Sequence, residues 1–350
     1  MKTKITKYFA AANSFFGFQS LFDEVFLRKK FNKIYVIKGG PGTGKSSLMK
    51  AVSKEFENKD CNVEYIYCSS DPDSLDGVII EKNERRIALL DGTAPHQTDA
   101  VLPGVCDEII NLAEGIDSRF LSAQRDNILS LDSEKKKCYR SAYDYLSIAG
   151  KAEKIIHSVY ILNFDIFATK SLAEGIILNF ACNDRSEKKR RFISSFGKRG
   201  LITFYCDFID FEKLVRIGGD PIKARILIGY LYKNHISKAT DSLLLPYPLD
   251  PDLYDGILLP EEKTGIIYDS ESEQRADEFF SLNKADEEKI KKAKQLKDEA
   301  LTEAQRWFSV AADMHFRLEE IYGEAMDFRR NESVLNNLIP QIENILENAI

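Results

Sequence analysis

The sequence IYVIKGGPGTGKSS, residues 34–47, decides the fold. Its first four residues are β-branched or aromatic, which is typical of a buried parallel strand. They lead into the pattern G-x-x-x-x-G-K-[ST] from Gly39 to Ser46, and residues 48–52 continue as a predicted helix. A strand, a glycine-rich loop and a helix in this order form the context of a phosphate-binding loop, the Walker A motif.

The residue types in this loop suit a nucleoside triphosphate and Mg²⁺, so the predicted cofactors are ATP and Mg²⁺. Glycines let backbone N–H groups turn toward phosphate oxygens, and the helix N-terminus adds the positive end of its dipole. Lys45 is expected to reach the β- and γ-phosphates, and Ser46 to ligate the metal. The predicted nucleotide-binding residues are Gly39, Gly40, Pro41, Gly42, Thr43, Gly44, Lys45, Ser46 and Ser47.

A second strand is predicted at residues 86–91, RIALLD, and it ends in Asp91. We expect Asp91 to hold the metal in the Walker B position, with a turn or cap role as the alternative. Gly92 follows it, so the carboxylate that activates water in many ATP hydrolases is missing from its usual place, which predicts slow intrinsic hydrolysis. His96 is expected to contact the γ-phosphate or position water, with a structural loop histidine as the alternative. The predicted catalytic residues are Lys45, Asp91 and His96.

An internal repeat divides the chain. Residues 71–80, DPDSLDGVII, and residues 250–259, DPDLYDGILL, begin 179 residues apart and share five identical positions. Other blocks match in the same order, so we predict two copies of one design, residues 1–187 and 188–350. Because the DPDxxDG motif is present in both copies, a turn or cap role is favoured for it over contact with a substrate.

The second copy has a degenerate loop. At an offset of 180, Pro41 corresponds to Pro221 and Lys45 to Arg225. The other replacements are Gly42 by Ile222, Gly44 by Ala224 and Ser46 by Ile226. An isoleucine neither tolerates a positive φ nor ligates Mg²⁺. We therefore predict no ordinary Mg-nucleotide site in this copy, and little effect of Arg225 on nucleotide affinity unless it reaches across to the first copy.

The fold class predicted from these elements is α/β, with two tandem P-loop NTPase-like three-layer units and mainly parallel sheets. Small and apolar residues at spacings of four and three, in residues 138–159 and 300–325, predict a long helix in each copy. Each helix is expected to pair with a preceding helix as a hairpin. Strands are predicted near residues 34–38, 63–68, 86–91, 213–217, 242–247 and 265–269.

Composition limits the partners and the location. The 350 residues carry a net charge of −6, 44% are hydrophobic and 30% are charged, as in an ordinary globular protein. We find no apolar run long enough to span a membrane, and the acidic balance makes nucleic-acid binding unlikely. The six cysteines show no metal-binding spacing, so a cytoplasmic location is predicted.

The expected partners are a nucleotide and a protein that docks on the helical hairpins. The basic run at residues 187–191 is read as a solvated linker, with a phosphate contact as the alternative.

Three blocks resemble a known family: GGPGTGKSSLMK at 39–50, CSSDPDSLDGVII at 68–80 and ALLDGTAPH at 88–96. They are similar to an uncharacterised family of tandem P-loop ATPase-like proteins from Firmicutes bacteria, and the resemblance covers nearly the whole chain. It implies an ATP-binding, ATPase-like cytoplasmic protein.

Three functions remain open from the sequence. The first is an ATPase or an ATP-dependent switch with one Mg-ATP site in the first copy. The second is a small-molecule or nucleotide kinase-like phosphotransferase, in which Asp71 or Asp73 contacts the acceptor. The third is a scaffold that binds ATP without hydrolysing it.

Overall fold

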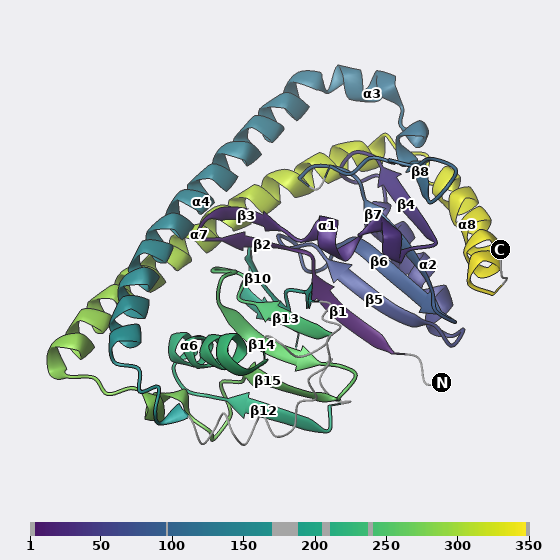
Figure 1. The fold of residues 1–350 in the computed structure, drawn as a ribbon. Coiled ribbons are helices and arrows are strands. Elements are labelled where there is room, and N and C mark those ends of the chain that lie inside the picture. Colours follow the sequence, from purple (N-terminus) through teal and green to yellow (C-terminus); the bar gives the residue numbers. More distant parts are fainter. Residues whose placement is uncertain (1–3, 96, 170–187, 205–210, 237–240, 348–350) are drawn as a thin grey trace.

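The computed structural model describes residues 4–95, 97–169, 188–204, 211–236 and 241–347, and it shows a mixed α/β protein with two sheets and two long helices (Figure 1). In the first sheet the order is β1-β5-β6-β7-β4-β8. Its strands are β1 (Ile5–Phe9), β5 (Asn62–Tyr67), β6 (Leu75–Lys82), β7 (Arg85–Asp91), β4 (Lys33–Lys38) and β8 (Asp107–Asn111). Only β6 runs against its neighbours, so the sheet is mainly parallel, as predicted.

The second sheet has the order β9-β13-β14-β15-β12. Its strands are β9 (Lys188–Arg190), β13 (Ser242–Pro246), β14 (Tyr254–Leu259), β15 (Thr264–Tyr268) and β12 (Lys213–Ile217). Here β14 is the strand that runs against its neighbours. All six predicted strands are present. The prediction omits β6 and β14, because the DPDxxDG motif was interpreted as a turn and the apolar run after it was not extended into a strand. It also omits the edge strands β1, β8 and β9.

Five strands of the first sheet, β1-β5-β6-β7-β4, follow the same order as the five of the second, and β8 has no counterpart among the described residues. The pairing register shifts between Ile66 and Tyr67 in β5, and between Leu245 and Pro246 in β13, which are positions 179 residues apart. Each half also has a β-hairpin. These hairpins are β2 (Ala11–Ser14) with β3 (Gly17–Ser20) and β10 (Ser194–Gly197) with β11 (Gly200–Thr203). The expected boundary, between residues 187 and 188, lies at the edge of residues 170–187, which are outside the described part of the chain.

The sheets pack against each other, which differs from the prediction of two separate three-layer units. Side chains alternate between the two faces of a strand. One set from the first sheet meets the second sheet in a common core that includes Ile34, Val36, Ile66, Ala88, Leu90, Leu245, Leu258 and Ile267. Helices cover the outer faces, with α2 (Lys45–Glu57) and α8 (Arg329–Glu347) on the first sheet and α6 (Pro221–Leu231) on the second. Both faces of each sheet are apolar, and the outer helical layer of the first sheet comes from both halves, because α8 belongs to the second half.

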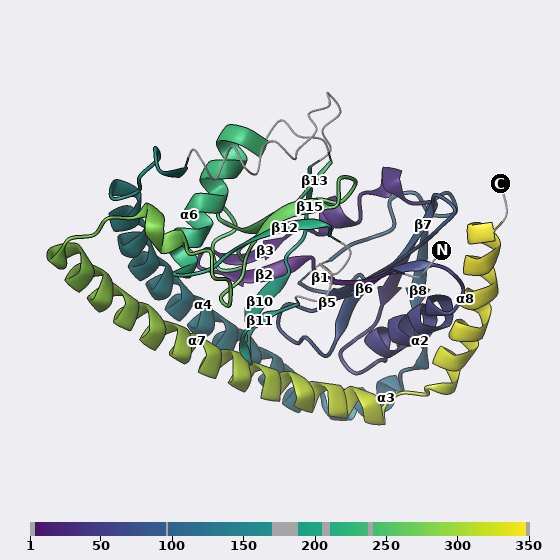
Figure 2. The same ribbon diagram turned by 90° about the horizontal axis from the view of Figure 1, so that it is seen from below.

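The long helices α4 (Arg125–Leu162) and α7 (Lys284–Glu324) pair with each other across the halves, so the prediction of a hairpin within each half is wrong (Figure 2). They contain 38 and 41 residues, about 57 and 62 Å at about 1.5 Å per residue. Lys297 lies 3.3 Å from Glu153, and the rings of Tyr139 and Phe308 lie 5.8 Å apart, so the pair is antiparallel. The small residues at spacings of four and three form a stripe, or seam, on each helix, and each seam is buried against the other long helix. This explains why each helix pairs with the long helix of the other half and not with a helix of its own half.

Shorter elements connect these layers. They are α1 (Phe22–Val25), η1 (Arg28–Lys30), η2 (Leu112–Gly115), α3 (Ser118–Ala123), the π-helical η4 (Tyr232–Ile236) and η5 (Ala276–Phe279). Among the described helices, none has the length and apolar character required to cross a lipid bilayer.

Candidate functional site

The glycine loop, residues 39–44, joins β4 to α2 and is shaped for an anion. Gly42 and Gly44 have φ values of 68° and 87°, which favour glycine. The Thr43 hydroxyl donates a hydrogen bond to the Gly40 carbonyl (2.8 Å) and closes the turn. Within the described chain, no acceptor takes a hydrogen bond from the backbone N–H groups of Gly40, Gly42, Thr43 or Gly44. Such a set of unsatisfied donors next to a helix N-terminus suits phosphate oxygens.

Lys45 and Asp91 meet at this loop, as expected. Lys45 opens α2, and its Nζ atom donates to the carbonyl oxygens of Gly40 (2.8 Å) and Gly39 (3.3 Å). Asp91 ends β7, which pairs in parallel with β4, so its carboxylate comes to the same edge of the sheet. The distance from Lys45 Nζ to Asp91 Oδ2 is 3.6 Å.

The two oxygens of Asp91 have different partners. Thr93 donates to Oδ1 from its backbone N–H (2.8 Å) and from its hydroxyl (2.6 Å), so this oxygen caps the turn. The other oxygen faces Lys45. Burial raises the pKa of the Asp91 carboxyl, the Lys45 ammonium opposes this shift, and the nearby Asp76 adds to it. Asp76, buried in β6, is a site residue that the sequence analysis missed. The signal was an aspartate at the same place in both copies, Asp76 and Asp255.

The Ser46 hydroxyl points toward the start of β6. Its Oγ atom accepts a hydrogen bond from the backbone N–H of Leu75 (2.9 Å). A hydroxyl oxygen has two lone pairs, so one remains for a cation. Among the described residues, no group of three or more histidine, cysteine or acidic side chains could hold a metal ion. His96 lies outside the described residues.

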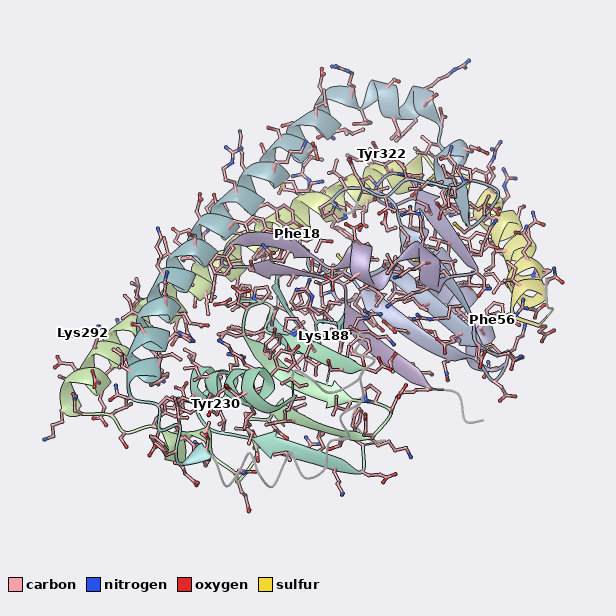
Figure 3. All side chains as sticks on the ribbon, in the orientation of Figure 1. Phe18, Phe56, Lys188, Tyr230, Lys292 and Tyr322 are labelled. Atoms are coloured by element: carbon pink, nitrogen blue, oxygen red, sulfur yellow. The ribbon has the colours of Figure 1, made fainter. Side chains whose placement is uncertain are left out.

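Helices α7 and α8 of the second half lie directly over the glycine loop. A Cβ atom added at Gly40 would lie 2.6 Å from the ring of Tyr322, which Figure 3 labels on α7. A Cβ atom added at Gly42 would overlap the backbone carbonyl of Glu319. Asn331 of α8 donates from Nδ2 to the Thr43 carbonyl (2.9 Å). No local pattern around the loop could have identified these contacts, because they come from the other end of the chain.

This close approach makes Gly42 sensitive to substitution. We expect Gly42→Ala to lower the free energy of unfolding by about 1–3 kcal/mol, because alanine is strained at a positive φ and its methyl group meets the backbone of α7. Denaturant unfolding measures the change. Gly229→Ala is the control, because Gly229 lies inside α6 with open space around it, and this change is expected to be neutral or slightly stabilising. Equal stability of the two variants would contradict the contact.

α7 also brings a histidine and a carboxylate to the loop. His315 and Glu319 are one turn apart, with 3.6 Å between Nε2 and Oε1. Burial and the positive charges of Lys135 and Lys45 lower the pKa of His315 to about 4, so it is neutral at pH 7. Burial raises the pKa of the Glu319 carboxyl, with a contribution from Asp71, while Lys45 and Lys198 oppose this shift. Both side chains therefore lie within electrostatic reach of Lys45.

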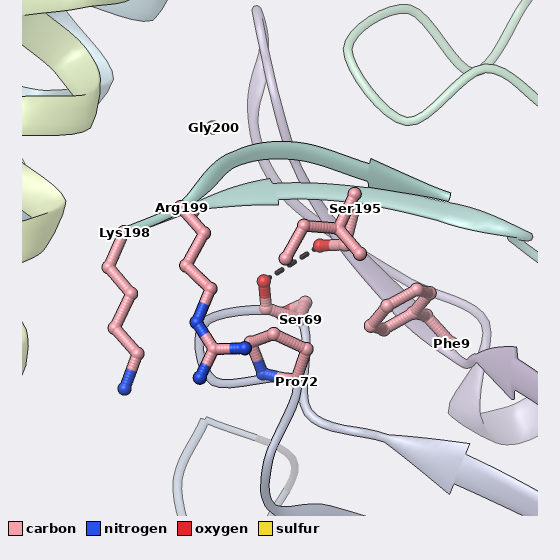
Figure 4. Close-up of a pocket in the computed structure, with 9 residues that line it drawn as sticks. Phe9, Ser69, Pro72, Ser195, Lys198, Arg199 and Gly200 are labelled. Atoms are coloured by element: carbon pink, nitrogen blue, oxygen red, sulfur yellow. Dashed lines mark hydrogen bonds between the residues drawn. The ribbon is translucent and has the colours of Figure 1, made fainter. Parts of the chain in front are cut away.

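The DPDxxDG turn of the first half is held by the β10–β11 hairpin of the second. Ser195 Oγ donates to the Ser69 carbonyl (2.7 Å), and the side chains of Lys198 and Arg199 extend beside Pro72 (Figure 4). Lys198 pairs with Asp71 (3.0 Å), and Arg199 pairs with Asp73. These contacts support the structural interpretation of the two aspartates.

The corresponding place in the second half is filled by its own side chains. Arg225 forms an ion pair with Asp255 (2.7 Å), and both side chains are buried. The Arg225 guanidinium also stacks 3.4 Å from the centre of the Tyr247 ring. Asp220 caps α6 and accepts a hydrogen bond from Tyr160 of α4 (2.9 Å). Arg225 thus lies inside the second half and does not reach the first glycine loop.

The basic run near residue 188 is not a solvated linker. Residues 188–190 form β9, and Arg190 pairs with Glu24 of α1. Arg191 pairs with Glu64 of β5 (2.6 Å). With Lys30, Arg86 and apolar neighbours, the run lines a cavity of about 210 Å³ between the halves, where Figure 3 labels Lys188. The run therefore fastens the two halves together.

Comparison with known proteins gives one short similarity. A family model described as Nephrocystin 3, N-terminal, matches residues 18–78, which extend from β3 through the glycine loop into β6. No curated protein matches the chain, and no solved structure does.

Proposed function

We propose that the chain binds Mg-ATP at residues 39–47 and works as an ATPase or an ATP-dependent switch with one site in its first half. The observation that carries this proposal is the glycine loop, with its unsatisfied N–H groups and Lys45 at its centre, 3.6 Å from Asp91. The resemblance to tandem P-loop ATPase-like proteins points the same way. The degenerate second loop, filled by Arg225 and Asp255, supports one site rather than two.

The residues present suit the nucleotide and the metal. The N–H groups of the loop would hold phosphate oxygens, and Lys45 would exchange its carbonyl acceptors for them. Ser46 and the Asp91 oxygen that faces Lys45 would hold Mg²⁺. Mg²⁺ commonly keeps water and phosphate oxygens as its other ligands, which agrees with the few protein ligands here. When bound, the metal would neutralise the phosphate charge.

The alternatives receive less support. In a phosphotransferase, Asp71 or Asp73 would contact the acceptor, but both carboxylates pair with cations of the β10–β11 hairpin. A protein partner would have to use the outer faces of α4 and α7, because the small-residue seams are buried between these helices.

A cytoplasmic location agrees with the four free thiols found among the described cysteines.

Release of phosphate from Mg-ATP tests the hydrolase proposal. We expect release by the parent chain and a loss of about 100-fold or more in Asp91→Asn, since the neutral amide is a much weaker metal ligand. Asp298→Asn, on the exposed face of α7, is the matched control and should behave as the parent. Equal rates for all three proteins would contradict the assignment of Asp91. ATP binding without release would favour the scaffold, and phosphate transfer to an added nucleoside would favour the phosphotransferase.

A further inference from the structure

We propose that the second half completes the ATP site, with Glu319 of α7 supplying the water-activating carboxylate that is missing after Asp91. The inference rests on the proposed function above. It gives the second half a defined task, since that half has no intact loop of its own and still places a helix on the loop of the first half.

The first support is the position of Glu319. Its backbone carbonyl lies against Gly42, so the residue is fixed beside the turn of the glycine loop. Its side chain is 44% exposed, so solvent reaches the carboxylate although it lies 3.6 Å from His315. Lys45 and Lys198 both stabilise its charged form. A general base has to come within hydrogen-bond reach of the water that it deprotonates, and a solvent-accessible carboxylate on a residue beside the loop allows this.

The second support comes from the repeat. His315 and Glu319 correspond, at an offset of 162, to Glu153 and His157 of α4. Each loop is therefore faced by a histidine and a glutamate one turn apart, contributed by the helix of the other half, but in reversed order.

Because the order of the histidine and the glutamate is reversed, the charge next to the basic residue differs between the two loops. At the degenerate loop, Glu153 is 4% exposed and lies 3.3 Å from Lys297. Burial raises the pKa of Glu153, and the charges of Lys297 and Arg225 oppose this rise. This carboxylate helps to neutralise the buried cation. At the first loop the same position holds His315, which is neutral at pH 7 and therefore adds no negative charge beside Lys45. The glutamate, Glu319, lies one turn further along α7, where its backbone meets Gly42 and its carboxylate lies 3.6 Å from His315.

The chemical step is a hydrolysis in which atoms and charges balance. A water oxygen attacks the γ-phosphorus as the bond from that phosphorus to the β,γ-bridging oxygen breaks, and the electron pair leaves with ADP. The water proton passes to the Glu319 carboxylate and then to solvent. Lys198, held by Asp71, is placed by the β10–β11 hairpin near the same carboxylate, where its charge opposes the rise in the pKa of Glu319 that burial and Asp71 cause.

The test is Glu319→Gln in the full chain, which keeps size and hydrogen bonding but removes the base. We expect the single-turnover rate of ATP hydrolysis to fall about 100-fold or more, while the dissociation constant of Mg-ATP and the thermal midpoint stay within error. Glu320→Gln, the adjacent exposed residue, is the matched control and should retain the parent rate.

The outcomes separate the two proposals. An unchanged rate in Glu319→Gln would overturn the role of Glu319 and leave ATP binding at the loop intact. A parent chain that binds ATP but releases no phosphate would overturn it as well. A parent chain that binds no ATP would instead overturn the proposed function.

Discussion

Replacing Lys45 with alanine will weaken the binding of Mg-ATP by about 100-fold or more. The Nζ atom of Lys45 already lies in the glycine loop, where it donates to two backbone carbonyls and faces Asp91. A charged hydrogen bond contributes about 1.5–3 kcal/mol, and the variant would lose at least one such bond to phosphate. The variant would also lose the attraction between the ammonium charge and the triphosphate.

Competition with a fluorescent ATP analogue measures this loss. Lys54→Ala is the control, because Lys54 is exposed on the same helix and away from the loop. It should bind as tightly as the parent. If Lys45→Ala and Lys54→Ala bound alike, the loop would not hold the phosphates.

Replacing Arg225 with methionine will lower the free energy of unfolding by about 3–5 kcal/mol. The guanidinium is buried, pairs with Asp255 at 2.7 Å and stacks on Tyr247. Arg225 also lowers the pKa of the buried carboxyls of Asp255 and Glu153 against the effect of burial. Removing one partner of a buried ion pair leaves a charge without compensation, which is the costly change.

A second variant shows whether the pair or the arginine alone matters. In Arg225→Met/Asp255→Leu both charges are gone, so we expect at least half of the lost stability to return. Denaturant unfolding of the two variants gives the comparison. Both should bind Mg-ATP as the parent does. A loss of less than 1 kcal/mol in the single variant, or a fall in its ATP affinity, would contradict a purely internal role for Arg225.

The parts of the fold that could be predicted from the sequence are those determined by residues close together along the chain. β4, the glycine loop and α2 follow one another directly, and their apolar and glycine patterns determine each in turn. The repeat was readable as well, because matching blocks such as residues 71–80 and 250–259 keep their order. The position of Asp91 beside the loop could be predicted, because parallel strands place their carboxyl ends at the same edge of a sheet.

The rest depends on contacts between distant residues. The small-residue seams of α4 and α7 show that each helix packs closely against another helix, but they do not say which one. Their pairing across the halves carries α7 over the glycine loop, where Tyr322 and Glu319 meet Gly40 and Gly42. Nothing near residue 40 signals a partner near residue 320. For a different reason, the strands β6 and β14 were not predicted, since a short apolar run alone does not distinguish a strand from a buried helix segment.

The most direct test of a single working site is a calorimetric titration of the full chain with Mg²⁺ and a non-hydrolysable ATP analogue. We expect one site per chain, retained in Arg225→Met and lost in Lys45→Ala. Two sites, or binding that survives in Lys45→Ala, would contradict the assignment of the nucleotide to the first glycine loop alone, and no binding by the parent would contradict nucleotide binding altogether.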